Sequence, residues 1–247
     1  MENNIERAVE LLKASNHATA FTGAGISVES GIPTFRGDNG FWSLYDPMTL
    51  DIDFFKNNPL KSWKVIKEIF YDFFDLSKPN DAHNSLAKME QRDFLKRIIT
   101  QNIDNLHQEA GSENVVEFHG SSHTLVCLDC KRRFNPSEVN LENLPVRCTA
   151  CGGLLKPDFI FFGEDIPRQA FLDAIKEAKK SDLMLVIGTS GEVMPASQVP
   201  LLAKQSGAKI IEVNTQHSHY TKKITDVFLE GKASEILNLM VSKLQDD

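Results

Sequence analysis

All four cysteines of this 247-residue chain lie in two Cys-x-x-Cys pairs, Cys127 with Cys130 and Cys148 with Cys151, which 17 residues separate. Each pair can direct two thiolates toward one point, and two such pairs match the ligand spacing of a zinc ribbon. A Gly-Gly dipeptide after the second pair permits the tight turn that such a site requires. Four cysteine ligands leave no coordination position open for water, so we predict a structural zinc ion. A redox pair or two disulfides is the alternative.

A histidine, His119, directly follows one of five short apolar runs. The runs are Ala18–Thr22, Arg97–Thr100, Val115–Phe118, Leu183–Ile187 and Lys209–Val213. Their β-branched and aromatic residues are typical of strands buried on both faces of a parallel sheet, and ligands bind beyond the carboxyl ends of such strands. An imidazole with a pKa of about 6.5 suits a general base at that edge. For the other histidines we expect surface, capping or packing roles, among them His83 and His107.

A glycine-rich loop follows the first run and begins with Gly23-Ala24-Gly25. This resembles the start of a dinucleotide-binding loop, in which glycines bring the backbone close to a pyrophosphate. Val28 stands where the third glycine of that fingerprint would fall, so a simple tight turn is the alternative for this motif. The loop continues through residues that supply a flexible cover, an aromatic ring and a cation, the last two being Phe35 and Arg36.

Helical patterns alternate with the apolar runs, at residues 1–14, 82–91, 103–110, 168–180, 196–206 and 234–244. Strands joined by such crossovers predict an α/β fold with a Rossmann-like parallel sheet. Two insertions interrupt the alternation. We expect an aromatic-rich helical module at 37–80 and a small zinc-ribbon module at 120–156, which leaves 1–36, 81–119 and 157–247 for the Rossmann-like domain.

The composition excludes several classes of function. Hydrophobic residues make up 41% of the chain and charged residues 25%, which is typical of a globular protein. The 27 basic and 34 acidic residues give a net charge of −7, which argues against nucleic acid as a partner. No apolar stretch approaches the roughly 20 residues that span a bilayer, so we expect no membrane partner and a cytoplasmic location.

Seven motifs, taken in order, resemble the sirtuins, which are NAD-dependent protein deacylases. They are GAGISVESGIPTFRG (23–37), TQNIDNLH (100–107), FHG (118–120), the paired Cys-x-x-Cys motif, FFGE (161–164), GTSGEVMPA (188–196) and VNT (213–215). The resemblance extends from residue 18 to about residue 233. It implies an enzyme that binds NAD, takes a protein or peptide acylated on lysine as substrate, transfers the acyl group to ADP-ribose and releases nicotinamide.

The resemblance also implies roles for individual residues. His119 would be the general base on a ribose hydroxyl, Asn102 would position the ribose and an ordered water, and Asp104 would accept a hydrogen bond from the nicotinamide carboxamide. Asp104 could equally cap the following helix, and the two roles are compatible. The implied cofactor-binding residues are Gly23, Ala24, Gly25, Ser27, Thr34, Phe35, Arg36, Trp42, Gln101, Asn102, Ile103, Asp104, Gly188, Thr189, Ser190, Asn214, Thr215 and Ala233.

By the same resemblance, an extended substrate peptide would pair its backbone with two segments of the chain, a mode called β-augmentation. The implied substrate-binding residues are Ile66, Ile69, Phe162, Gly163, Glu164, Val193 and Met194. The branch of the family that removes malonyl and succinyl groups carries a tyrosine and an arginine where Ile66 and Ile69 align here. An acyl carboxylate would therefore be buried without a cation. We expect acetyl or longer hydrophobic acyl groups in preference to succinyl.

Two other functions fit parts of the sequence. The same NAD site could serve ADP-ribosylation of protein, which some relatives catalyse. Alternatively, the chain could be a non-catalytic binding module built on the zinc ribbon, with the Rossmann-like fold as a scaffold. The second alternative predicts that His119→Ala leaves the function unchanged.

Overall fold

The centre of the chain is a six-stranded sheet in which every neighbouring pair is parallel, in the order β3-β2-β1-β7-β8-β9. The computed structural model describes residues 2–35 and 40–245. The strands are β1 (Ala18–Thr22), β2 (Arg97–Thr100), β3 (Val115–Glu117), β7 (Leu183–Ile187), β8 (Lys209–Asn214) and β9 (Val227–Glu230). The predicted Rossmann-like α/β fold is therefore confirmed.

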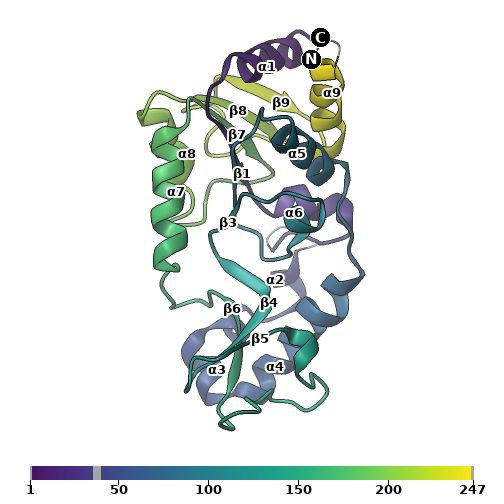
Figure 1. Cartoon of the computed structure of the whole chain (residues 1–247). Helices are drawn as coiled ribbons and strands as arrows, with labels where there is room; N and C mark the ends of the chain where they lie inside the picture. The colour runs from purple at the N-terminus through teal and green to yellow at the C-terminus, as the bar shows by residue number, and fades with distance from the viewer. Residues whose placement is uncertain (1, 36–39, 246–247) are drawn as a thin grey trace.

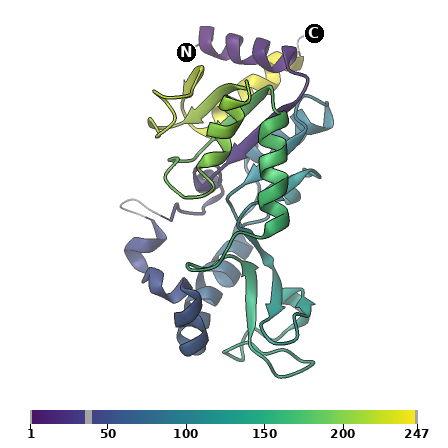
Figure 2. The same cartoon turned by 90° about the vertical axis from the view of Figure 1, so that its left-hand side faces the viewer.

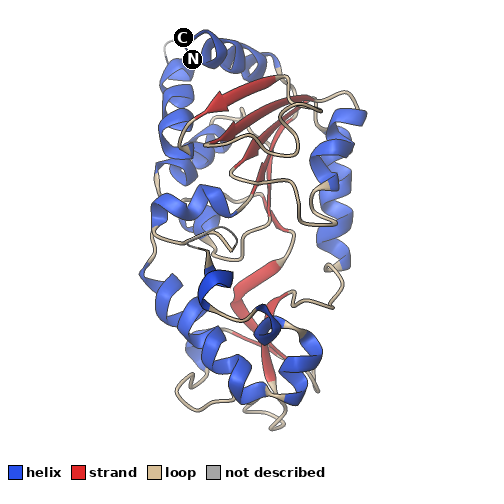
Figure 3. Ribbon diagram, turned by 180° about the vertical axis from the view of Figure 1, so that it is seen from behind, coloured by secondary structure: helices blue, strands red, loops and turns tan. Residues whose placement is uncertain are grey.

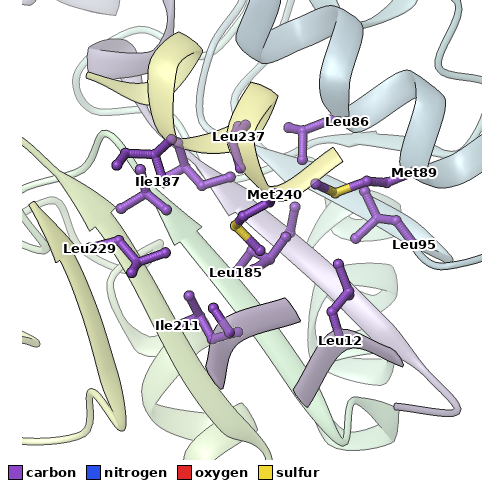
Figure 4. Close-up of a cluster of buried hydrophobic side chains, with 14 of the residues drawn as sticks. Leu12, Leu86, Met89, Leu95, Leu185, Ile187, Ile211, Leu229, Leu237 and Met240 are labelled. Carbon is purple, nitrogen blue, oxygen red and sulfur yellow. The ribbon is translucent and has the colours of Figure 1, made fainter. Parts of the chain in front are cut away.

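Helices cover both faces of this sheet (Figure 1). On one face lie α1 (Glu2–Ala14), α5 (Asp81–Gln91) and α9 (Ala233–Gln245), and on the other lie α7 (Arg168–Lys180) and α8 (Gln198–Gln205). Strand β7 serves both layers, because its side chains alternate: Leu183, Leu185 and Ile187 join the first cluster, and Met184 and Val186 join the second. Figure 4 shows Leu185, Ile187 and Ile211 of the sheet facing Leu237 and Met240 of α9.

A smaller lobe, residues 41–76 and 120–159, lies below the carboxyl ends of β1 to β3 in Figure 1 and is separate from the helical layers in Figure 2. Its helical part contains α2 (Phe41–Leu44), α3 (Ile52–Asn57), α4 (Pro59–Lys67), a π-helix (Glu68–Phe73) and short 3-10 turns at Pro47–Leu50 and Phe74–Leu76. Its second part is an antiparallel sheet, β5-β4-β6, with β4 (Gly120–Cys127), β5 (Arg133–Phe134) and β6 (Leu155–Phe159), and a 3-10 turn at Pro136–Glu138.

The two parts of the small lobe are distant in sequence but lie side by side in the fold (Figure 3), and they share one hydrophobic cluster. Trp63 of α4 is fully buried, and its indole N–H donates to the backbone carbonyl of Leu155 at 3.0 Å. The Tyr71 hydroxyl donates to the carbonyl of Ser122 at 2.9 Å. Each contact joins the helical part to the antiparallel sheet, so neither part buries its apolar face alone.

Several elements differ from the sequence prediction. The helix expected at 103–110 is only α6 (Leu106–Glu109), because Asn105 adopts a left-handed conformation with φ of 62° and the Asp104 carboxylate accepts the Leu106 N–H, so the helix begins there. Strands β4 and β9 lie where no strand was predicted. Within residues 2–35 and 40–245, we find no helix with the length and hydropathy needed to cross a membrane.

Candidate active site and metal centre

The four cysteine sulfurs converge at one end of the small lobe. Their Sγ atoms all lie within 4.8 Å of one another, with 3.5 Å between Cys127 and Cys151 and 3.8 Å between Cys130 and Cys148. A tetrahedral zinc ion with Zn–S bonds of about 2.3 Å requires sulfurs about 3.8 Å apart. The donor set and its spacing therefore fit zinc, held by four thiolates with no open position, as the spacing predicts.

Two loops at the carboxyl ends of β1 and β7 are packed against each other. The Gly23 and Gly25 N–H groups donate to the carbonyls of Ile187 and Gly188. A Cβ on Gly25 would lie 2.7 Å from Gly188 Cα, and one on Gly188 would lie 2.5 Å from the Ile26 nitrogen. Glycine is therefore required here for loop-to-loop packing. Among the described residues, the Ala24 N–H has no hydrogen-bond partner and remains available to a ligand.

A buried polar network lies behind these loops. Ser27 Oγ accepts from Asn102 Nδ2 at 3.1 Å and donates to Asp104 Oδ2 at 2.7 Å, and it lies 3.4 Å from His83 Nε2. Burial raises the pKa of the Asp104 carboxyl, although the hydrogen bond from Ser27 opposes the rise. The network thus brings together three predicted cofactor residues from the ends of two strands and fixes their side chains.

Two histidines extend this network into the core. The rings of His83 and His107 lie 5.0 Å apart in an edge-to-face arrangement, and His107 Nε2 lies 2.9 Å from Thr22 Oγ1. Burial lowers the pKa of His83 to about 4 and that of His107 well below its usual range, so both rings are neutral at pH 7. The capping role expected for His83 is confirmed, because its Nδ1 accepts the Asn80 N–H at the start of α5. The His83 side chain is fully buried, so this cap lies inside the protein and not at its surface.

His119 lies at the carboxyl end of β3. Its Nδ1 is 2.9 Å from the Gln101 carbonyl, which can only accept, so Nδ1 carries the proton and Nε2 has a free lone pair. No described residue hydrogen-bonds to Nε2. Burial lowers the pKa of His119, and the hydrogen bond to Gln101 opposes that effect. His119 is therefore a neutral imidazole at pH 7, and its Nε2 can accept a hydrogen bond or a proton from a ligand.

Three aromatic side chains connect the glycine-rich loop with the small lobe. The Phe35 ring lies 5.4 Å from the Trp42 ring, which in turn lies 6.0 Å from Phe162. The Phe35 and Thr34 carbonyls accept N–H groups of α2, from Trp42 and Phe41. Arg36, also expected at the cofactor, lies outside the described residues.

The remaining expected cofactor residues surround the ends of β7 and β8. Asn214 Nδ2 donates to the Thr189 carbonyl at 3.0 Å, and Gln101 Nε2 donates to Thr189 Oγ1 at 3.1 Å. Ser190 is exposed, and its carbonyl accepts the His219 N–H. Ile103 is 7% exposed. Thr215 is exposed beyond β8, and Ala233 is buried at the start of α9. Residues after β7, β8 and β9 thus extend the strand-end edge beyond Gly188, whereas Gln101 and Ile103 follow β2.

The expected substrate residues form two exposed segments and one buried pair. Phe162 is 51% exposed and Met194 63%, and their neighbours Gly163 and Val193 are also exposed. Ile66 and Ile69 are at most 1% exposed and belong to the apolar cluster of the small lobe. Their role as the lining of an acyl pocket stays a prediction. A separate polar cavity of about 430 Å³, lined in part by Gln108, Glu117, His123 and Asp158, contains none of the expected site residues.

The comparisons with known proteins agree with this arrangement. Residues 23–195 match the model of the Sir2 family. An NAD-dependent protein deacylase of Thermococcus kodakarensis is 44% identical, over 97% of this chain and 95% of that protein. A solved structure from work on the mechanism and regulation of Sir2 enzymes is 44% identical, with a TM-score of 0.89, and covers 99% of this chain and 100% of its own. A Sir2 structure with a p53 peptide and NAD+ is 34% identical, with a TM-score of 0.90, over 98% of this chain and 99% of its own.

Because the family model spans most of the chain and the relatives match it from end to end, the resemblance found in the sequence is confirmed, and the chain belongs to the Sir2 family.

Proposed function

We propose that this member of the Sir2 family is an NAD-dependent protein-lysine deacylase in which His119 is the general base. The observation that carries the proposal is the state of the His119 ring. Its Nδ1–H donates a hydrogen bond to the Gln101 carbonyl, and its Nε2 has no partner among the described residues. Burial lowers the pKa of the ring and so keeps it neutral at pH 7. A neutral imidazole at a ligand-binding strand edge can accept a proton at physiological pH.

When bound, NAD supplies the ADP-ribose that accepts the acyl group and the nicotinamide that leaves. The chain's residues hold and shield it. The Ala24 N–H would donate to a phosphate, Asp104 would accept from the carboxamide, and Asn102, fixed by Ser27, would orient the ribose. His119 Nε2 would take the proton of a ribose hydroxyl. Phe35 and Trp42 would exclude water, which would otherwise hydrolyse the reactive sugar.

The substrate in this proposal is a peptide or protein with an acylated lysine. Its backbone would pair with the exposed segments that contain Gly163 and Val193, so affinity would come mainly from main-chain hydrogen bonds. Ile66 and Ile69 provide no cation for an acyl carboxylate, which supports acetyl or longer hydrophobic acyl groups over succinyl. A cytoplasmic location and the absence of nucleic-acid and membrane partners remain part of the proposal.

The test is mass spectrometry of the products from an acetyl-lysine peptide with and without NAD. We expect free lysine peptide, nicotinamide and acetyl-ADP-ribose, all dependent on NAD. His119→Ala should slow deacylation by roughly 10²- to 10⁴-fold, the usual contribution of a general base. His123→Ala is the matched control, because His123 is exposed and four residues away on the same segment, and it should keep full activity.

Two results would contradict the deacylase activity itself. One is an acetylated peptide that stays intact with wild-type protein and NAD. The other is labelled ADP-ribose attached to protein with no acetyl-ADP-ribose formed, which would favour the ADP-ribosyltransferase alternative. An unchanged rate of deacylation in the His119→Ala variant would contradict the assignment of His119 as the general base.

A further inference from the structure

A buried lysine, Lys156 on β6, has no role in the proposed reaction. Its side chain is only 5% exposed, although lysine is among the side chains least often buried. Its ammonium donates to the carbonyls of Pro157 at 2.8 Å and Phe159 at 2.6 Å, and it lies 2.9 Å from Glu164 Oε2. These three acceptors match the three N–H donors of the ammonium. The ammonium also lies 4.2 Å from the centre of the Phe161 ring.

The partner of this lysine closes a turn at Phe161–Glu164. The Glu164 N–H donates to the Phe161 carbonyl at 3.0 Å, and Glu164 Oε2 accepts the Phe161 N–H at 2.8 Å. Gly163, the third residue of the turn, has a φ of 86°, which a turn of this kind requires. Glu164 Oε2 therefore contacts both the Lys156 ammonium and the first N–H of the turn. The ion pair ties the turn to β6.

The turn at Phe161–Glu164 lies next to the segment that carries His119. Phe159 of β6 pairs with Gly120, and the Ile160 N–H donates to the carbonyl of His119. Phe162 uses both of its backbone groups on Leu50 and Ile52. For Gly163, in contrast, no partner of its N–H or carbonyl lies among the described residues. The turn thus presents an open backbone edge, attached on one side to the segment that carries His119.

We propose that Lys156 is a positioning residue for the acylated peptide, acting through Glu164 to hold the open edge at Gly163 in register with His119. The inference rests on the proposed function. The Glu164 side chain faces inward to Lys156 and Phe161, so at Gly163 and Glu164 the turn offers the substrate its backbone. Without the ammonium, the Glu164 carboxylate, already 26% exposed, turns to water and releases the Phe161 N–H. Of the two hydrogen bonds between Phe161 and Glu164, the turn then keeps only the one from the Glu164 N–H to the Phe161 carbonyl.

The experiment compares Lys156→Met, Glu164→Gln and the double variant with the wild type. Lys156→Met keeps an unbranched side chain, shorter by the ammonium group, and removes the charge. We expect KM for an acetyl-lysine peptide to rise about tenfold in each single variant, the effect of losing one charge-assisted hydrogen bond. KM for NAD should stay within twofold of the wild type. Because both residues act through one contact, KM for the peptide in the double variant should be no higher than in the more affected single variant.

Lys204→Met is the matched control. Lys204 on α8 pairs with Asp226, another partly buried carboxylate, which accepts the Ile210 N–H at the amino-terminal end of β8. This pair is at the opposite end of the sheet from the site, so its loss should lower stability and leave both KM values unchanged. Urea unfolding of each variant measures that stability. If Lys156→Met does not fold, Glu164→Gln gives the same readout, because it removes the charge and keeps the shape.

Calorimetric titration with the acetyl-lysine peptide separates this inference from the proposed function. The titration needs no turnover, so a wild type that binds the peptide but does not deacylate it contradicts the proposed function alone. Equal peptide affinity in the wild type and the single variants would overturn the positioning role. A parallel rise in KM for NAD and for peptide would overturn it too, since that pattern indicates general loosening of the fold.

Discussion

Replacing Gly188 by alanine perturbs the contact between the two loops at the cofactor edge. Gly188 has a φ of 60°, and a Cβ there would lie 2.5 Å from the backbone nitrogen of Ile26. Ordinary contact begins near 3.4 Å, so the two loops must separate by about 0.9 Å. The added Cβ is fixed to the backbone of residue 188 and the atom that it meets is a backbone nitrogen, so no side-chain rotation can relieve the overlap. The displaced loop carries Ala24, whose N–H we expect at a phosphate.

The expected effect of Gly188→Ala has two parts. The left-handed conformation costs an alanine roughly 1–2 kcal/mol of folding free energy. A displacement of about 1 Å in a substrate-positioning loop can lower the rate by about 100-fold. We therefore expect the free energy of unfolding in urea to fall by about 1–2 kcal/mol. The value of kcat/KM for NAD should fall by roughly 10- to 100-fold at saturating peptide.

Gly207→Ala separates these two parts. Gly207 also has a positive φ, 104°, but a Cβ there meets nothing within 4 Å. This variant should lose a similar amount of stability and keep the wild-type kcat/KM for NAD. If the two variants show the same NAD kinetics, the loop contact does not shape the cofactor site, and the reasoning from steric overlap is wrong.

Three further predictions concern protons and metal. Since burial lowers the pKa of His119, the acid limb of the pH–kcat/KM profile should have its midpoint below the ordinary value of about 6.5; a higher midpoint contradicts the assignment. Burial lowers the pKa of His83 to about 4, so between pH 6.5 and pH 4 the unfolded chain binds a proton that the folded chain does not. The free energy of unfolding in urea should therefore fall by roughly 3 kcal/mol from pH 7 to pH 4, and a His83→Asn variant should lack this decrease. Removal of zinc by a chelator under reducing conditions should shift the fluorescence of Trp42 and Trp63, which both pack in the small lobe, and equimolar zinc should reverse the shift; an unchanged spectrum argues against a structural ion.

The central strands could be predicted from sequence because burial on both faces leaves a continuous apolar run. The bounds of β1, β2 and β7 agree with the predicted runs. Strand β9 gives a weaker signal, since it is a four-residue edge strand in which Phe228 is half-buried and Glu230 exposed. The segment 103–110 has a helical pattern, but the conformation of Asn105 delays the helix, and no pattern in the sequence reveals a left-handed residue there.

Part of the candidate site was also within reach of sequence reasoning. A residue that follows a buried parallel strand must lie at the ligand-binding edge, and this placed His119, Gly23 and Gly188 together. The buried polar residues could not be found this way. His83 and its neighbour Ser27 are 56 residues apart, and Lys156 meets its carboxylate partner, Glu164, because the chain turns at Gly163. Contacts of that kind depend on the fold, and periodicity does not encode them.

The shared core of the small lobe has a consequence for the protein during synthesis. Trp63 and the carbonyl that accepts its indole N–H are 92 residues apart in the chain. At about 5–20 residues per second, the ribosome needs roughly 5–20 s to make the second segment after the first. Throughout that interval, the aromatic side chains of residues 41–76 have no sheet to cover them. During that interval, this segment therefore offers a chaperone an uncovered aromatic surface.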